Sequence, residues 1–256
     1  MAPQIILVTG AARSLGLAIT KSLLTSSPAG SNIYLTARSP TAGHAAIDAI
    51  PTSLKTEDRS VHYLPLDITS PPSISAVART IKSRHGRLDV LINNAGVELD
   101  MQSRGKSRAA IIEGTMPTNY YGVVNVCKEF LPLIPPGGRI VIVSSTAGHL
   151  KHFTSEELKR KISAGDLTVP RLTEMMHEFE AGEEEGWPKS AYSATKAAQT
   201  ALTGILAREN SRVKVNSCCP GWVDTDMGRH VGNKPPKTCG TYRGPISLVL
   251  GKGKQC

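Results

Sequence analysis

Residues 5–16 read IILVTGAARSLG and place a glycine turn between a short apolar run and apolar residues at helical spacing. The run predicts a buried strand, and the stripe of Leu15, Ile19 and Leu23 predicts a helix. In such a unit the helix N-terminus presents unpaired N–H groups to a pyrophosphate, so the turn predicts a nucleotide site. A simple tight turn is the alternative. The residues expected to contact the nucleotide here are Gly10, Arg13, Ser14, Leu15 and Gly16.

The same alternation continues along the chain, and it predicts the fold class. Further short apolar runs lie at 32–36, 61–66, 88–92, 139–144 and 213–217. Between 116 and 134 one apolar helical stripe is formed by Met116, Tyr120, Val123, Cys127, Phe130 and Ile134. Strands that alternate with helices predict an α/β fold with a doubly wound parallel sheet, here of six strands. A chain of 256 residues favours one domain, which we assign to residues 1–234.

Composition and charge exclude several classes of protein. Hydrophobic residues make up 40% and charged residues 20%, which excludes a disordered, collagen-like or coiled-coil chain. Five cysteines without CxxC spacing encode neither a disulfide framework nor a zinc site. With no apolar run near the roughly 20 residues of a membrane span and no leader pattern, we expect a cytoplasmic protein without a membrane partner.

The net charge of +9 raises the alternative of nucleic-acid binding. Residues 228–256 contain six Lys and Arg and no acid, so they account for +6 of this charge. The first 227 residues hold the other 24 of the 30 bases against all 21 acids, which is an ordinary mixed surface. We therefore expect no nucleic-acid partner.

Residues 149–189 interrupt the alternation after the fifth apolar run. This insertion contains two charge-rich helical patterns, TSEELKRKIS at 154–163 and PRLTEMMHEFEAGEEEG at 170–186. A connection of this length is usually a lid or an added subdomain, with surface decoration as the alternative. We expect a helical insertion.

The end of the second expected strand bears on the choice of cofactor. Residues 36–38 read Thr-Ala-Arg and lack the carboxylate that would bind an unmodified adenosine ribose. Guanidinium groups pair bidentately with phosphate oxygens, so Arg38 and Arg13 suit a 2′-phosphate. This favours NADPH/NADP, with exposed surface arginines as the alternative.

Polar residues follow the other expected strands at the same edge of the sheet. Residues 93–96 read NNAG after the fourth strand, where small residues let the backbone approach a ligand. Asn119 lies on the apolar face of the next helix, either as a satisfied core amide or as a catalytic brace. Ser145 ends the fifth strand. Tyr192 and Lys196 share one helix face, where an ammonium favours the phenolate electrostatically.

In this order the glycine turn, NNAG, Asn119, Ser145, Tyr-x-x-x-Lys and the segment PGWVDT at 220–225 resemble the short-chain dehydrogenase/reductase family. Features similar to its carbonyl reductase branch are LTAR at 35–38, TMPTNYYG at 115–122 and EGWPKSAY at 185–192. The resemblance covers residues 4–234 and implies a Rossmann fold.

The resemblance also implies a function and a catalytic tetrad of Asn119, Ser145, Tyr192 and Lys196. Tyr192 would donate the proton, Ser145 would bind the substrate oxygen, and Lys196 would supply charge and hold the nicotinamide ribose. Asn119 would hold a water that links Lys196 to solvent. The implied reaction is NADPH-dependent reduction of aldehydes, ketones or quinones to alcohols. A non-catalytic NADPH-binding regulator that senses redox state is the alternative.

The remaining implied contacts concern the cofactor and the assembly. Asp67 and Ile68 would contact the adenine and Asn94 the adenosine ribose. The other implied cofactor contacts are Ala95, Gly96, Pro220, Gly221, Val223 and Thr225. The insertion would cover the face through which relatives form tetramers, which implies a monomer. Trp187 and Trp222 would flank the substrate pocket or lie in the core.

Two features depart from the family pattern. Ser14 stands at the middle glycine of the turn, where a positive φ is expected, so we expect weakened cofactor binding, with the serine hydroxyl capping the helix. Residues 235–256 form a divergent basic tail in which only 246–250 has strand character. We expect this tail to dock loosely and to leave the pocket open.

Overall fold

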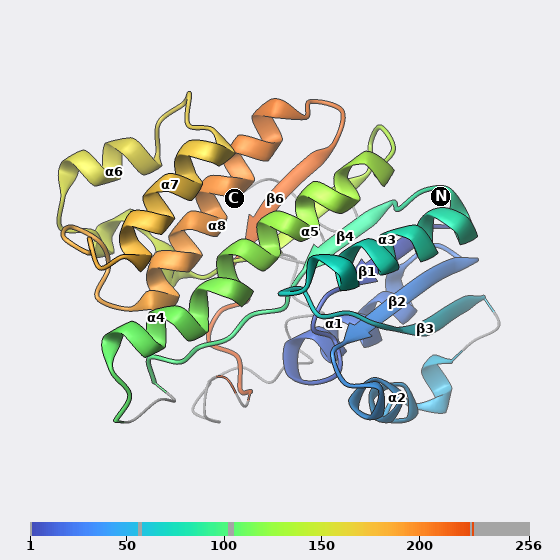
Figure 1. Cartoon of the computed structure of the whole chain (residues 1–256). Helices are drawn as coiled ribbons and strands as arrows, with labels where there is room; N and C mark the ends of the chain where they lie inside the picture. Colours follow the sequence, from blue (N-terminus) through green and yellow to red (C-terminus); the bar gives the residue numbers. More distant parts are fainter. Residues whose placement is uncertain (1, 56–57, 102–104, 226, 228–256) are drawn as a thin grey trace.

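Among the described residues, six parallel strands form one sheet in the order β3-β2-β1-β4-β5-β6 (Figure 1). The structure is a computed structural model that describes residues 2–55, 58–101, 105–225 and 227. The strands are β1 (Ile5–Val8), β2 (Ser31–Ala37), β3 (Arg59–Pro65), β4 (Val90–Asn93), β5 (Arg139–Val143) and β6 (Lys214–Cys218). Each begins and ends within two residues of the run that predicted it, so the six-stranded parallel sheet is confirmed. The tail at 235–256 lies outside the described residues.

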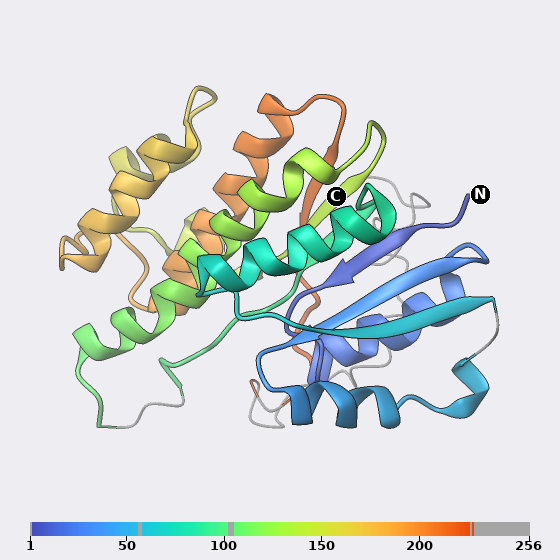
Figure 2. The same ribbon diagram turned by 45° about the vertical axis from the view of Figure 1, so that its right-hand side comes forward.

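Helices cover both faces of the sheet, which is why the inner strands β1 and β5 read as nearly continuous apolar runs. Ile6 and Val8 of β1 share a buried cluster with the first two helices, whereas Ile5 and Leu7 point into a larger cluster on the opposite face. On that second face α3, α5 and α8 follow one another across the sheet (Figure 2). The longer helices are α1 (Ser14–Ser26), α2 (Pro40–Asp48), α3 (Pro71–His85), α4 (Arg108–Met116), α5 (Val123–Phe130), α6 (Glu156–Ile162), α7 (Val169–Glu180) and α8 (Ala191–Glu209). None of the described helices is both long and apolar enough to cross a bilayer.

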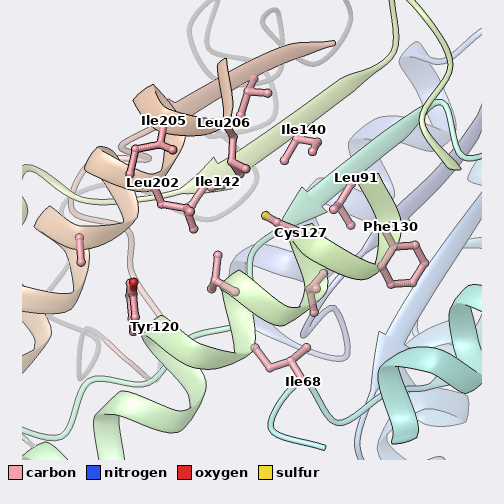
Figure 3. Close-up of a cluster of buried hydrophobic side chains, with 14 of the residues drawn as sticks. Ile68, Leu91, Tyr120, Cys127, Phe130, Ile140, Ile142, Leu202, Ile205 and Leu206 are labelled. Carbon is pink, nitrogen blue, oxygen red and sulfur yellow. The ribbon is translucent and has the colours of Figure 1, made fainter. Parts of the chain in front are cut away.

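The stretch between β4 and β5 is divided rather than one continuous helix. A π-helical turn, Pro117–Gly122, separates α4 from α5, and a 3-10 turn, Leu131–Leu133, follows α5. The predicted stripe nevertheless lies in the core, and Figure 3 shows Tyr120, Cys127 and Phe130 packed toward the sheet and α8. Because Pro117 has no N–H to donate, an ordinary helical hydrogen bond is lost where the wider turn begins. This turn carries Asn119.

Two helices of the insertion, α6 and α7, lie beyond α8 at the outer side of the molecule (Figures 1 and 2). Trp187 is buried there between Phe153 and Phe179, with ring centroids 5.5 and 5.1 Å away. Of the two alternatives for Trp187, a pocket wall or the core, the core is the one found, because its indole fills the small core that attaches the insertion. Trp222 is different, because it is 60% exposed.

Helix α8 packs closely against the 3-10 turn η4 (Thr146–Gly148) that follows β5. A Cβ built on Gly148 would lie 2.5 Å from the carbonyl carbon of Lys196 and 2.5 Å from the backbone nitrogen of Ala197. Both atoms belong to the helix backbone and cannot move aside without displacing α8. Only glycine therefore fits between this turn and the helix.

We predict that Gly148→Ala lowers the free energy of unfolding by about 1–3 kcal/mol, as overpacking against backbone does. Denaturant unfolding measures the change. Gly165→Ala is the matched control, because no atom lies within 4 Å of the added Cβ. If the two variants have equal stability, the close packing of α8 on η4 is not a constraint on the fold.

Candidate active site

The turn after β1 is built around two glycines that allow close packing. A Cβ on Gly10, whose φ is +61°, would lie 2.8 Å from the Cα of Ala95. A Cβ on Gly16 would lie 2.5 Å from the carbonyl oxygen of Gly10 and 2.6 Å from Nδ2 of Asn94. The absent side chains let the turn and the N-terminus of α1 lie directly against the end of β4. This leaves a backbone cradle of the kind that accommodates a pyrophosphate.

Hydrogen bonds hold this cradle in place. The hydroxyl oxygen of Thr9 accepts from the backbone N–H groups of Asn94 and Ala95, both at 3.0 Å. In return, Nδ2 of Asn94 donates to the carbonyl oxygens of Thr9 and Gly10 at 2.9 and 3.0 Å. Thr9 is buried and was not singled out from the sequence, although it ends the first apolar run. Asn94 therefore fixes the turn in addition to any contact with a ligand.

Ser14 adopts the backbone conformation expected of the glycine it replaces. Its φ is +48°, and it is the sole non-glycine residue with a positive φ among the described residues. Left-handed backbone costs a residue with a Cβ roughly 1–2 kcal/mol. The expectation that Ser14 caps the helix is wrong in position, because α1 begins at Ser14 and Arg13 is its N-cap residue. The strain lies at the point where a nucleotide would be bound.

A cavity of about 1110 Å³ extends from this turn along the carboxyl ends of the strands. Every residue expected from the sequence to contact the nucleotide lines it: Gly10, Arg13, Ser14, Leu15, Gly16, Arg38, Asp67, Ile68, Asn94, Ala95, Gly96, Tyr192, Lys196, Pro220, Gly221, Val223 and Thr225. Arg13 and Arg38 are exposed on its wall. Trp222, Met101 and Glu98 line it as well. The cavity is therefore long, with exposed guanidinium groups near the glycine turn.

Ser145, Tyr192 and Lys196 meet in the wall of the same cavity. Tyr192 is in the first turn of α8, and Ser145, which follows β5, forms a hydrogen bond with it. The ammonium nitrogen of Lys196 lies 5.4 Å from the centre of the Tyr192 ring. It donates to the carbonyl oxygen of Val143 at 2.7 Å and to Oε1 of Gln199 at 3.0 Å. A hydroxyl, a phenol and a buried cation are thus held within one small region.

Burial has the largest effect on the pKa values of Tyr192 and Lys196. It raises the pKa of Tyr192 to about 12, a hydrogen bond from Ser145 acts in the opposite direction, and the charges of Cys219 and Glu98 raise it further. Burial also lowers the pKa of Lys196 to about 8. The pKa of Tyr192 is therefore raised and not lowered, because removal from water has the largest effect on it. Tyr192 carries its proton throughout the neutral range, and Lys196 is mostly charged at pH 7.

Asn119 does not line the cavity; it lies fully buried behind it. Its side-chain oxygen accepts from the N–H of Val97 at 2.8 Å, and its amide nitrogen donates to the Val97 carbonyl at 2.8 Å and to Thr195 at 3.3 Å. The side chain thus braces the segment that follows β4 against α8. Of the two readings of this residue, a satisfied buried amide describes its side chain.

Asp100 was missed from the sequence because its partners are distant in the chain. Its carboxylate accepts from the hydroxyl of Ser190 at 3.0 Å and from the backbone N–H groups of Ala191 and Tyr192 at 3.0 and 2.9 Å. Arg108 donates to it at 3.2 Å and also pairs with Glu184 of the insertion. A carboxylate at a helix N-terminus satisfies free N–H groups and the helix dipole. Asp100 therefore fixes the first turn of α8, where Tyr192 lies.

The family model for short chain dehydrogenase matches residues 4–156 and 180–236. The chain belongs to this family. It is 38% identical over 245 residues to carbonyl reductase [NADPH] 3 of Rattus norvegicus, covering 90% of this chain and 86% of the relative. It is 37% identical over 247 residues to carbonyl reductase [NADPH] 1 of Homo sapiens, covering 91% and 87%. The resemblance to the carbonyl reductase branch is confirmed.

Solved structures of other family members have the same fold. Salutaridine reductase from Papaver somniferum superposes with a TM-score of 0.81 at 28% identity, covering 96% of this chain and 95% of that chain. Menthone neomenthol reductase from Mentha piperita gives 0.80 at 26% identity, covering 98% and 95%. Both likenesses extend over nearly the whole chain and confirm the Rossmann architecture.

We predict that Asp100→Asn lowers the free energy of unfolding by about 1–3 kcal/mol, because an amide nitrogen faces N–H groups that need an acceptor. Hydrogen exchange of the amides of Ala191 and Tyr192 should accelerate more than exchange elsewhere in α8. Asp166→Asn, at an exposed carboxylate, is the control and should stay within about 0.5 kcal/mol. Unchanged exchange in the first turn would show that Asp100 does not hold it.

Proposed function

We propose that this chain catalyses the NADPH-dependent reduction of carbonyl compounds, namely aldehydes, ketones or quinones, to alcohols. The observation that carries the proposal is the meeting of Ser145, Tyr192 and Lys196 in the wall of a cavity that also contains the glycine cradle. The curated relatives named carbonyl reductase [NADPH] support the same activity and cofactor. The substrate is a small molecule that binds in this cavity, whose lining includes the large apolar side chains of Trp222 and Met101.

The residues of the cavity fit NADPH. The cradle at Gly10 and Gly16 has no Cβ to obstruct a pyrophosphate, and the exposed Arg13 and Arg38 suit a 2′-phosphate. Asp67 and Ile68 would contact the adenine, Asn94 the adenosine ribose, and the segment 220–225 the carboxamide, with Lys196 at the nicotinamide ribose. When bound, the cofactor supplies a hydride to the carbonyl carbon.

The chain's own residues would manage the proton and the developing charge. Tyr192 donates its phenolic proton to the carbonyl oxygen, and its high pKa keeps that proton in place at neutral pH. Ser145 donates a hydrogen bond to the same oxygen as negative charge develops there. The charged Lys196 stabilises the phenolate that Tyr192 becomes. Asn119 would hold a water that links Lys196 to solvent, and its side chain is engaged with Val97.

The alternative is a non-catalytic NADPH-binding regulator that senses redox state. It would need the cradle and the arginines but not a phenol, a hydroxyl and a buried ammonium in one place. The presence of all three favours the enzyme. We further propose a monomer, because α7 packs against α8 and α4 and covers an outer helical face. The cytoplasmic location stays a prediction.

We predict that NADPH binds at least about tenfold more tightly than NADH, which corresponds to about 1.4 kcal/mol. Titration of each nucleotide measures the ratio. Arg38→Asp should abolish or reverse the preference, because a carboxylate repels the 2′-phosphate. Arg79→Asp, on the exposed side of α3, makes the same charge change away from the cavity and should preserve it. Equal affinities in the unmodified protein would contradict the assignment of the arginines.

We predict that Tyr192→Phe lowers turnover by at least ~100-fold, the usual contribution of a general acid, and leaves NADPH affinity within a few-fold. NADPH consumption with a panel of carbonyl compounds measures the rate. Tyr121→Phe is the control, because that hydroxyl donates to Glu180 outside the cavity. Substantial activity in Tyr192→Phe would mean that the proton comes from another group.

A further inference from the structure

Gln199 lies three residues after Lys196 on α8 and is 1% exposed. Its Oε1 accepts from the ammonium of Lys196 at 3.0 Å, and its Nε2 donates to the backbone carbonyl of Asn119 at 2.7 Å. A reversed amide would set its NH₂ group against the ammonium and its oxygen against the carbonyl. Both partners therefore favour the same orientation of this side chain. The amide links the buried cation to the π-helical turn between α4 and α5.

The ammonium of Lys196 depends on neutral acceptors. It is 4% exposed, and two of its three N–H donors are taken by Val143 and Gln199. Among the residues that the structure describes, no carboxylate forms an ion pair with it. The titratable groups that face it are Tyr192 on its own helix and the thiols of Cys218 and Cys219 at the end of β6. A buried cation without acceptors is strongly unfavourable, so loss of either acceptor should destabilise the charged form of Lys196.

We propose that Gln199 is a positioning residue of the active site, whose amide holds the charged ammonium of Lys196 at a fixed place between β5 and the π-helical turn. Burial brings the pKa of Lys196 down to about 8, so this cation loses its proton only slightly above neutral pH. An acceptor that bonds only to the charged form opposes that loss. Gln199 would thereby extend the pH range over which Lys196 is charged.

The same amide affects the role expected of Asn119. The family resemblance implied a water held by Asn119 as the link from Lys196 to solvent. The backbone carbonyl of Asn119 accepts from Gln199, which reaches Lys196 directly. An amide held in one orientation fixes where the Lys196 ammonium lies but does not relay protons. The consequence for catalysis rests on the proposed function, whereas the effect on Lys196 does not.

The first test measures Lys196 itself by NMR titration of the labelled lysine in the full chain. Gln199→Met removes the acceptor with little change in volume and should lower the pKa of Lys196 by about one unit. Gln199→Glu keeps an oxygen beside the ammonium, adds negative charge, and should raise it. Thr203→Val is the matched control, because it removes a buried hydroxyl one turn further along α8 that donates to the Gln199 carbonyl and not to Lys196. That control should leave the titration unchanged.

The second test is the pH dependence of kcat for carbonyl reduction. Activity should fall as Lys196 loses its proton, so this alkaline limb should move down by about one pH unit in Gln199→Met and up in Gln199→Glu. If Gln199 only filled space, its replacement would change neither the alkaline limb of the pH profile nor the pKa of Lys196. Unchanged values in Gln199→Met overturn the inference; if that variant does not fold, an unchanged or lowered value in Gln199→Glu overturns it. If the two variants shift the pKa of Lys196 in opposite directions but the chain has no reductase activity, the proposed function is overturned and the role of Gln199 stands.

Discussion

The buried ammonium of Lys196 is the interaction on which the arrangement of the site depends. It reaches from α8 to the last carbonyl of β5 and, through Gln199, to the π-helical turn that follows α4. A cation out of water requires acceptors from fixed backbone, so its presence constrains how these three elements pack. The cost of burying it is also what gives it an unusually low pKa.

The position of α8 is fixed independently at two points, and both serve the same side chains. Asp100 binds the N–H groups of its first turn, which sets Tyr192, and Gly148 lets η4 lie against the backbone at Lys196. Ser144 adds a hydrogen bond to the Lys196 carbonyl at 3.0 Å. The helix is therefore held through its own backbone atoms, which can adapt less than the tips of side chains can. Precise placement of Tyr192 and Lys196 follows from packing more than from their four-residue spacing.

The sheet was predictable because its signals are local, whereas several determinants of the site are not. Strand β1 is buried on both faces, so residues 5–8 read as an unbroken apolar run, and the positive φ of Ser14 was expected from its place in the turn. Asp100 pairs with residues about 90 positions later, and Gln199 meets Asn119 across 80 residues. No periodicity marks such pairs. Trp187 was equally ambiguous, because an aromatic residue near a motif reads alike in a core and in a pocket.

The positive charges at the cavity are solvated differently: those of Arg13 and Arg38 are exposed, and that of Lys196 is buried. We therefore expect the arginines to act in nucleotide binding and the lysine in proton transfer. Arg13 and Arg38 are exposed, so they attract an anionic group without a desolvation cost and are screened by salt. Lys196 is buried, so the charge that we propose to stabilise the Tyr192 phenolate is little screened. Binding strength should therefore depend on ionic strength through the arginines, while proton transfer should depend on pH through the lysine. The fold separates these charges by placing Arg38 after β2 and Arg13 at the start of α1, whereas Lys196 contacts the end of β5.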